Sequence, residues 1–300
     1  MATDIDDSTH TLPLTCPICD APLRATGAAL ACRDGHTFDV AREGYVNLLP
    51  SQHRVSGMVG DTPDMLQARR RFFDEGHFAP LLETLTADVE RIERERSQRR
   101  AADDGSPTTI LEVGCGEGYY IGSIADRLSA ALGPGVSFLG TDLSKPAVRL
   151  AAKRYPATRF FVADVNRRLY LEDASASILL DVFAPRNPDE FARVLEPGGF
   201  ALIVIPGDAH LADLREEFGL LGIQPGKEAL VVERFAQHFR LAERTEVRYP
   251  MELSAEAVRD LVGMGPNRWH RREDDASLRA TGPRSTEASF VVLGLQRDES

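Results

Sequence analysis

Three cysteines and a histidine near the amino terminus have the spacing of a metal site. Two residues separate Cys16 from Cys19, twelve more precede Cys32, and another three precede His36. This C-x2-C-x12-C-x3-H arrangement is typical of structural zinc sites, in which four protein ligands leave no position open for a substrate. The alternative is three reduced thiols and an incidental histidine. We predict a bound Zn²⁺ ion, which supplies folding free energy that a short ribbon cannot obtain from a hydrophobic core.

A second group of residues can bind a nucleoside. Gly114, Gly116 and Gly118 form a G-x-G-x-G run preceded by Glu112. The run differs from the G-x-G-x-x-G of dinucleotide folds, and glycines at such a turn let a ligand approach the backbone closely. Asp142 follows Gly118 by 24 residues, at the end of a predicted strand, where a carboxylate can bind two ribose hydroxyls. A nicotinamide-type site and a purely structural glycine turn are the alternatives.

Strands and helices alternate around these residues. The hydrophobic periodicity predicts strands over 109–113, 136–141, 159–163, 177–182 and 200–205, with helices over 119–132, 144–154 and 188–195. Asp164 follows the third strand, where a carboxylate can meet an adenine amino group. Further helices are expected near 208–219, 232–239 and 254–262, and strands over 244–253 and 287–295 are expected to pair as an edge. The alternation predicts a parallel sheet with helices on both faces.

The composition is that of a globular protein. Of 300 residues, 43% are hydrophobic and 27% are charged, which excludes disordered, collagenous and disulfide-stapled classes. The sequence contains no apolar run of membrane-spanning length and begins without a secretory signal pattern, so we expect a cytoplasmic protein. The formal net charge of −11 argues mildly against a nucleic-acid partner, but a basic groove can exist on an acidic protein.

The run Glu112-x-Gly-x-Gly-x-Gly, with its two later aspartates, resembles the first motifs of class I S-adenosylmethionine methyltransferases. Glu196-Pro-Gly-Gly, just before the strand predicted over 200–205, resembles another recurrent turn of these enzymes. The resemblance implies an α/β fold, a class I (Rossmann-like) methyltransferase sheet, preceded here by an amino-terminal zinc ribbon. It also implies S-adenosyl-L-methionine as the cofactor.

The ribbon and the methyltransferase motifs together resemble the RlmA-type (RrmA) 23S rRNA guanine-N1 methyltransferases. The similarity extends from about residue 16 to residue 295, in segments 32–49, 60–70, 76–78, 182–186 and 264–270. This family methylates N1 of a guanine in a tunnel-lining hairpin of large-subunit rRNA. The FAPRNP and MGP stretches resemble its macrolide (tylosin) resistance branch more than its enteric branch. The resemblance therefore implies rRNA processing, RNA binding, antibiotic resistance and a homodimer.

The resemblance also implies which residues contact the cofactor. In addition to the glycine loop (residues 114–118), Glu112, Asp142 and Asp164, the contacts fall on Phe78, Tyr120, Ile121 and His210. Phe78 can equally be a core residue. His210 follows a strand at its carboxyl end, where ligands bind in such sheets.

Guanine N1 carries a proton that must leave before or during methyl transfer. Asp181, at the end of the fourth predicted strand, is the positional candidate for the base, although an acid there can instead cap a turn. Phe183 can stack on a flipped guanine, or belong to the core, and Arg186 can meet a carbonyl or a phosphate. Basic candidates for RNA contact lie at 69–71, 145–154, 167–168 and 268–272, and at Arg24 and Arg33.

We therefore expect three regions. These are a zinc-binding, RNA-recognition ribbon over 1–50, a helical connector over 51–108, and a methyltransferase domain over 109–300. Two other functions remain open at this point: a methyltransferase of a small molecule, and a non-catalytic zinc-ribbon protein that binds RNA. The ribbon favours a macromolecular substrate, and the intact glycine loop argues against loss of activity.

Overall fold

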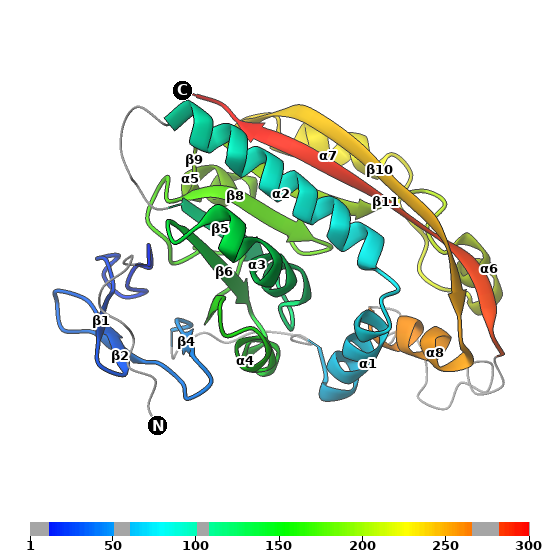
Figure 1. Cartoon of the computed structure of the whole chain (residues 1–300), viewed down its shortest axis with the longest axis horizontal. Helices are drawn as coiled ribbons and strands as arrows, with labels where there is room; N and C mark the ends of the chain where they lie inside the picture. Colours follow the sequence, from blue (N-terminus) through cyan, green and yellow to red (C-terminus); the bar gives the residue numbers. More distant parts are fainter. Residues whose placement is uncertain (1–11, 51–60, 101–107, 266–281, 300) are drawn as a thin grey trace.

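The computed structural model describes residues 12–50, 61–100, 108–265 and 282–299, and Figure 1 shows how they are arranged. Within these residues, eight strands form one sheet in the order β10-β11-β9-β8-β5-β6-β7-β4. Their bounds are β4 Tyr45–Asn47, β5 Thr108–Val113, β6 Val136–Asp142, β7 Arg159–Val162, β8 Ala176–Val182, β9 Leu195–Pro206, β10 Phe239–Leu253 and β11 Arg284–Arg297.

The strands from β4 to β9 are parallel, and β11 pairs antiparallel with both β9 and β10. β5 lies at the centre, between β6 and β8, and every residue of β5 and β8 is buried. Such continuous burial is typical of parallel strands covered on both faces. The carboxyl ends of β5, β6 and β8 therefore meet at one edge, where ligands bind in open α/β sheets.

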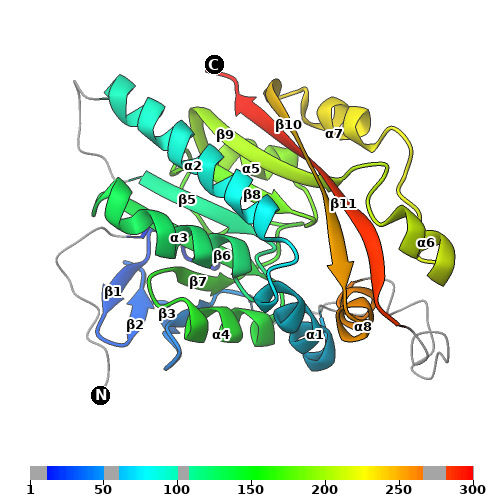
Figure 2. The same cartoon turned by 45° about the vertical axis from the view of Figure 1, so that its right-hand side comes forward.

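Helices cover both faces of the sheet, as Figure 2 shows. One hydrophobic cluster joins the sheet to α1, α2, α3, α4, α6 and α8, and a second joins its other face to α5, α7 and the amino-terminal residues. The helices are α1 Pro63–Asp74, α2 Ala79–Arg100, α3 Tyr119–Leu132, α4 Lys145–Arg154, α5 Pro188–Val194, α6 Ala212–Phe218, α7 Lys227–Phe235 and α8 Ala255–Gly263.

The zinc ribbon (residues 12–40) holds a small sheet of β1 (Arg24–Thr26), β2 (Ala29–Ala31) and β3 (Thr37–Asp39). Backbone hydrogen bonds connect it to the segment between β7 and β8: the Thr15 amide donates to the Tyr170 carbonyl at 2.9 Å, and the Glu172 amide donates to the Pro13 carbonyl at 2.8 Å. The ribbon thus packs directly on the large sheet's domain. β4, which lies within the range predicted as ribbon, is an edge strand of the large sheet itself.

Most predicted elements are confirmed, and two expectations need correction. The helix expected over 232–239 is α7, which begins after Gly226 and ends at Phe235, so that Phe239 already starts β10. The two late strands do pair, but β11 also pairs with β9 and only β10 is at the edge. Among the described residues, no helix is both long and apolar enough to cross a membrane.

Candidate cofactor site and zinc centre

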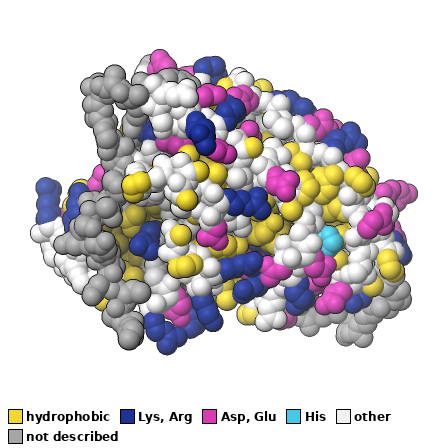
Figure 3. All heavy atoms as spheres, in the orientation of Figure 1, with side chains coloured by type: hydrophobic (Ala, Val, Ile, Leu, Met, Phe, Trp, Pro, Cys, Tyr) yellow, Lys and Arg dark blue, Asp and Glu magenta, His cyan; other side chains and the backbone are white. Residues whose placement is uncertain are grey.

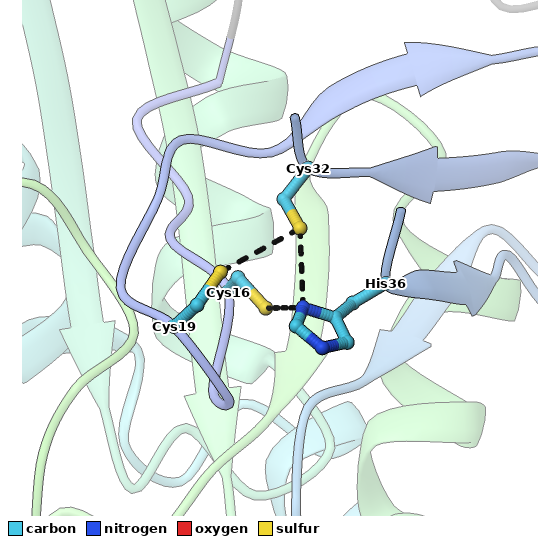
Figure 4. Close-up of side chains that lie close together, drawn as sticks. All are labelled: Cys16, Cys19, Cys32 and His36. Atoms are coloured by element: carbon cyan, nitrogen blue, oxygen red, sulfur yellow. Dashed lines mark hydrogen bonds between the residues drawn. The ribbon is translucent and has the colours of Figure 1, made fainter. Parts of the chain in front are cut away.

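The four predicted zinc ligands lie together, with their side chains pointing toward one another (Figure 4). Their ligand atoms all lie within 4.8 Å of each other. The Cys19 and Cys32 sulfurs are 3.6 Å apart, and His36 Nδ1 is 3.3 Å from the Cys32 sulfur. A tetrahedral Zn²⁺ with zinc–sulfur bonds of about 2.3 Å separates its ligand atoms by roughly 3.7 Å, so the cage fits this ion.

The glycine loop passes from the end of β5 into α3, and its backbone requires glycine. Gly114, Gly116 and Gly118 have φ values of +64°, +55° and +79°, a left-handed region that side chains disfavour. A Cβ at Gly114 would lie 2.5 Å from Ala184 Cβ, and one at Gly118 would lie 2.9 Å from the Phe160 ring. Glycine is therefore required at these positions both by the backbone conformation and by close packing against neighbouring segments.

Two carboxylates fix the loop from either side. Asp142 accepts from the Gly116 amide at 2.8 Å and from the Ser144 amide at 2.7 Å, which joins the loop to the start of α4. Glu112 accepts from the Ile121 amide at 2.9 Å. Burial raises the pKa of Glu112 to about 8 and also raises that of Asp142, whose two amide partners oppose the shift.

Two of the residues assigned to the cofactor by resemblance, Phe78 and His210, lie close together beside β11. The Phe78 ring is buried, and both it and His210 contact Phe290 of β11, with ring centroids 4.9 and 4.6 Å from that of Phe290. Burial lowers the pKa of His210 to about 3, so the imidazole is neutral, and its Nδ1 accepts from the Ser289 amide. Phe78 is thus part of the core and lies beside His210 at the same time.

The remaining predicted cofactor residues lie in α3 and in the turn after β7. Tyr120 and Ile121 are buried in the first turn of α3, and the Ile121 amide donates a hydrogen bond to the Glu112 carboxylate. Asp164 accepts from the Asn166 amide at 3.0 Å in the turn after β7. Among the described residues, the Tyr120 hydroxyl and the Thr141 hydroxyl are buried without a hydrogen-bond partner. Polar groups of this kind next to a glycine loop fit a ligand that supplies the missing bonds.

The predicted substrate residues lie just beyond β8. Phe183 is 44% exposed, adopts a left-handed backbone with φ of +58°, and its ring centroid is 5.6 Å from that of Phe290. Asp181 is fully buried, and its carboxylate accepts from Arg186 Nε at 3.2 Å. Burial raises the pKa of Asp181 to about 7, while Arg186 opposes that shift. Arg186 therefore faces inward, and Asp181 does not reach the surface.

Sequence reasoning missed Glu117, between the second and third glycines of the loop. Its side chain is buried, both carboxylate oxygens have no partner among the described residues, and burial raises its pKa to about 7. The sequence holds no periodic or spacing signal for this burial, because it results from packing of α1 and α4 over the loop.

A groove separates the zinc ribbon from α1 and α4. Its cavity volume is about 2560 Å³, well above the ~300–1,000 Å³ of small-molecule pockets. Seven lysines and arginines line this basic groove, against one acid, Glu43. The seven are Arg24, Arg42, Arg70, Lys145, Arg149, Lys153 and Arg159. Figure 3 shows lysine and arginine side chains gathered over α4. Predicted basic residues 268–272 lie outside the described residues.

Comparison with known proteins agrees with this architecture. The family model described as "RlmA, N-terminal" matches residues 14–57, and "Methyltransferase domain" matches residues 110–199. A protein from Streptomyces fradiae named 23S rRNA (guanine(748)-N(1))-methyltransferase is 41% identical over 266 residues, 89% of each chain. The chain belongs to the RlmA-type 23S rRNA guanine-N1 methyltransferase family.

Two further relatives of the family are provisionally named 23S rRNA (guanine-N(1)-)-methyltransferase. The one from Micromonospora griseorubida is 39% identical over 89% of this chain and 90% of its own. The one from Bacillus subtilis is 32% identical over 88% of this chain and 89% of its own. Membership confirms the class I methyltransferase fold with a zinc ribbon and an enzyme that uses S-adenosylmethionine, and the Cys/His cluster of this structure lies within that zinc ribbon.

Proposed function

We propose that this enzyme methylates N1 of a guanine in a tunnel-lining hairpin of 23S rRNA. The observation that carries the proposal is the basic groove between the ribbon and α4. It extends along α4 to Lys145, which follows Asp142 by three residues in the sequence. A methyltransferase of small molecules has no use for a long positive groove between a zinc ribbon and its catalytic domain.

The charges of the groove match an RNA backbone. Lys145, Arg149 and Lys153 are exposed at successive turns of α4. Among these three only Arg149 has an ion pair with a described residue, at 2.8 Å from Glu43 in the segment between the ribbon and β4. The overall charge of −11 is therefore unevenly distributed, with positive side chains concentrated where phosphates would lie. Because phosphate contacts set register without reading sequence, the groove positions the hairpin while the methyl-transfer site selects one base.

The residues of the chain bind the cofactor and the guanine and orient them toward each other. We assign the glycine loop, Glu112, Asp142, Tyr120 and His210 to cofactor binding, together with Phe78, Ile121 and Asp164. S-adenosylmethionine, when bound, supplies a methyl group that is already activated, so the protein's main contribution is alignment. Phe183 offers an exposed aromatic face for the guanine.

By resemblance to the family we further propose the target base, the effect on drug susceptibility, the cellular location and the oligomeric state. The target is the guanine equivalent to the one in the Streptomyces fradiae relative's name, and its methylation reduces susceptibility to tylosin-type macrolides. The enzyme is a cytoplasmic homodimer. Light scattering tests the dimer, and drug susceptibility of a sensitive strain expressing the protein tests the resistance.

The reaction itself is tested by incubating the purified protein with 23S rRNA and S-adenosylmethionine, then digesting the RNA to nucleosides for mass spectrometry. We expect 1-methylguanosine at up to one residue per rRNA molecule. A methyl group on a different nucleoside, or no transfer by protein that binds the cofactor, contradicts the proposal. Gly114→Ala, which fills the loop, is the inactive control.

A further inference from the structure

The turn that follows β8 (residues 183–186, the Phe183 turn) joins the two halves of the site. On one side it touches the glycine loop: Ala184 Cβ occupies the space that a Cβ at Gly114 would need, at 2.5 Å. On the other side it carries the exposed Phe183 ring. The position of this turn therefore sets the distance between the cofactor loop and the aromatic face.

The turn is strained and needs an external constraint. Phe183 has a φ of +58°, in a region that bulky side chains seldom adopt, and nearly half of its side chain is exposed rather than packed. Such a conformation persists only where the surroundings impose it, and it is found most often at functional sites. Its amide has a single long hydrogen bond, 3.5 Å to the Val204 carbonyl.

Asp181 and Arg186 provide the constraint. Asp181 lies two residues before the Phe183 turn and Arg186 is the last residue of the turn, and the Arg186 Nε donates to the Asp181 carboxylate at 3.2 Å. Arg186 Nη2 lies 3.5 Å from the Val204 carbonyl of β9, and Arg234 of α7 donates to the Arg186 carbonyl at 2.7 Å. The turn is thus held to the strand before it, the neighbouring strand and a helix.

We propose that Asp181 and Arg186 are positioning residues, which hold Phe183 as a stacking platform for the target guanine at a fixed distance from the glycine loop. This inference rests on the proposed function. It replaces the predicted roles of Asp181 as the base and of Arg186 as a substrate contact.

The burial of the pair decides between these roles. The Asp181 side chain is 0% exposed and that of Arg186 is 13% exposed, and each faces the other. A general base must come within hydrogen-bonding distance of the proton it removes. The Asp181 carboxylate is fully buried and bonded to Arg186, so contact with guanine N1 would require Arg186 and the Phe183 turn to move.

A positioning role predicts a slower methyl-transfer step. Misplacement of reacting groups by about 1 Å can slow a reaction roughly 100-fold. For Asp181→Asn and Arg186→Ala we expect single-turnover methylation of the rRNA hairpin to slow by about 10- to 100-fold. Affinities for S-adenosylmethionine and for RNA should stay within about twofold of the wild type, because the glycine loop and the basic groove are intact.

The experiment combines these variants with Phe183→Ala. If the pair acts through Phe183, adding Asp181→Asn to Phe183→Ala causes little further loss of rate, because the platform is already gone. Arg186→Lys should restore part of the rate that Arg186→Ala removes, since an ammonium can still reach the carboxylate. Glu196→Gln is the matched control: it removes one of the two carboxylate partners of Arg96, in a largely buried ion pair at the opposite end of the parallel strands.

Two results would overturn the proposal. One is a rate for Asp181→Asn or Arg186→Ala within twofold of the wild type, and the other is a rate effect that adds fully to that of Phe183→Ala. Should Asp181→Asn fail to bind S-adenosylmethionine, Arg186→Lys and Arg186→Ala carry the same test. Failure of the wild-type enzyme to methylate the hairpin would instead overturn the proposed function, and the positioning role with it.

Discussion

Glu112 is a carboxyl group buried at the end of the central strand, and its pKa of about 8 links proton binding to stability. Between its usual value of 4.5 and about 8, the folded protein holds a proton that the unfolded chain releases. Stability from this group is therefore complete below pH 4.5 and is lost as pH rises, at up to about 1.4 kcal/mol per pH unit.

Glu112→Gln should remove this dependence. We expect the variant without cofactor to gain stability relative to the wild type as pH rises from 5 to 8, because the wild type must ionise a buried carboxyl. Denaturant unfolding at several pH values measures it. A constant difference between the two proteins across this range would show that Glu112 titrates normally.

Gly114 combines a left-handed backbone with the closest contact in the loop. For Gly114→Ala we expect S-adenosylmethionine affinity to fall by at least about tenfold, because the new methyl group collides with Ala184 and the backbone must shift. Gly219→Ala is the control, since Gly219 also has a positive φ, +58°, but no described atom lies within 4 Å of its added Cβ. Calorimetric titration measures both affinities, and an equal loss in Gly219→Ala, at the end of α6, would mean that general destabilisation, not the change in the glycine loop, weakens cofactor binding.

At this scale the sequence predicts residue types and spacing well but orientation poorly. The four zinc ligands and the three glycines follow from spacing alone, because the zinc ligands form two close pairs on two local turns and the glycines lie on one loop. The inward orientation of Arg186 could not be predicted, since it depends on Val204 and Arg234, which other elements supply. The same holds for the burial of Glu117.

The zinc ribbon contains only three short strands, β1, β2 and β3, so we expect the bound metal to stabilise its fold. For Cys32→Ser we expect zinc content to fall from one ion per chain toward zero and RNA affinity to drop by at least about tenfold, while S-adenosylmethionine affinity changes less than about twofold. The methyltransferase sheet has its own core and does not need the ion. Cys115→Ser, outside the set, is the control for zinc content.

Metal analysis and the two binding titrations check this prediction. Unchanged RNA affinity in the zinc-free Cys32→Ser protein would contradict a role for the ribbon in RNA binding.

The boundaries of the helices and strands show where sequence patterns fail. α3 was predictable to the residue from its apolar spacing, whereas β4 was not recognised as a strand of the large sheet, because its three residues gain order only by pairing with β7.

At the scale of the whole molecule, seven basic side chains line one groove of a protein whose net charge is −11. The basic groove and the acidic remainder should make RNA binding steeply salt-dependent. For Lys145→Ala with Lys153→Ala, we expect the slope of log affinity against log salt to decrease by about 2, one for each phosphate that a lysine no longer neutralises. Arg248→Ala, on β10 at the opposite edge of the sheet, should leave the slope unchanged. A double variant with the wild-type slope would exclude the groove as the RNA site.

The measurement that tests the central claim most directly is reverse-transcriptase primer extension on large-subunit rRNA treated with the enzyme. A methyl group on guanine N1 occupies the base-pairing edge and halts the polymerase one nucleotide before it. We predict a new stop at a guanine of the tunnel-lining hairpin that requires both S-adenosylmethionine and an intact glycine loop. The absence of any such stop on free rRNA and on ribosomal subunits, with protein that binds the cofactor, would contradict the account.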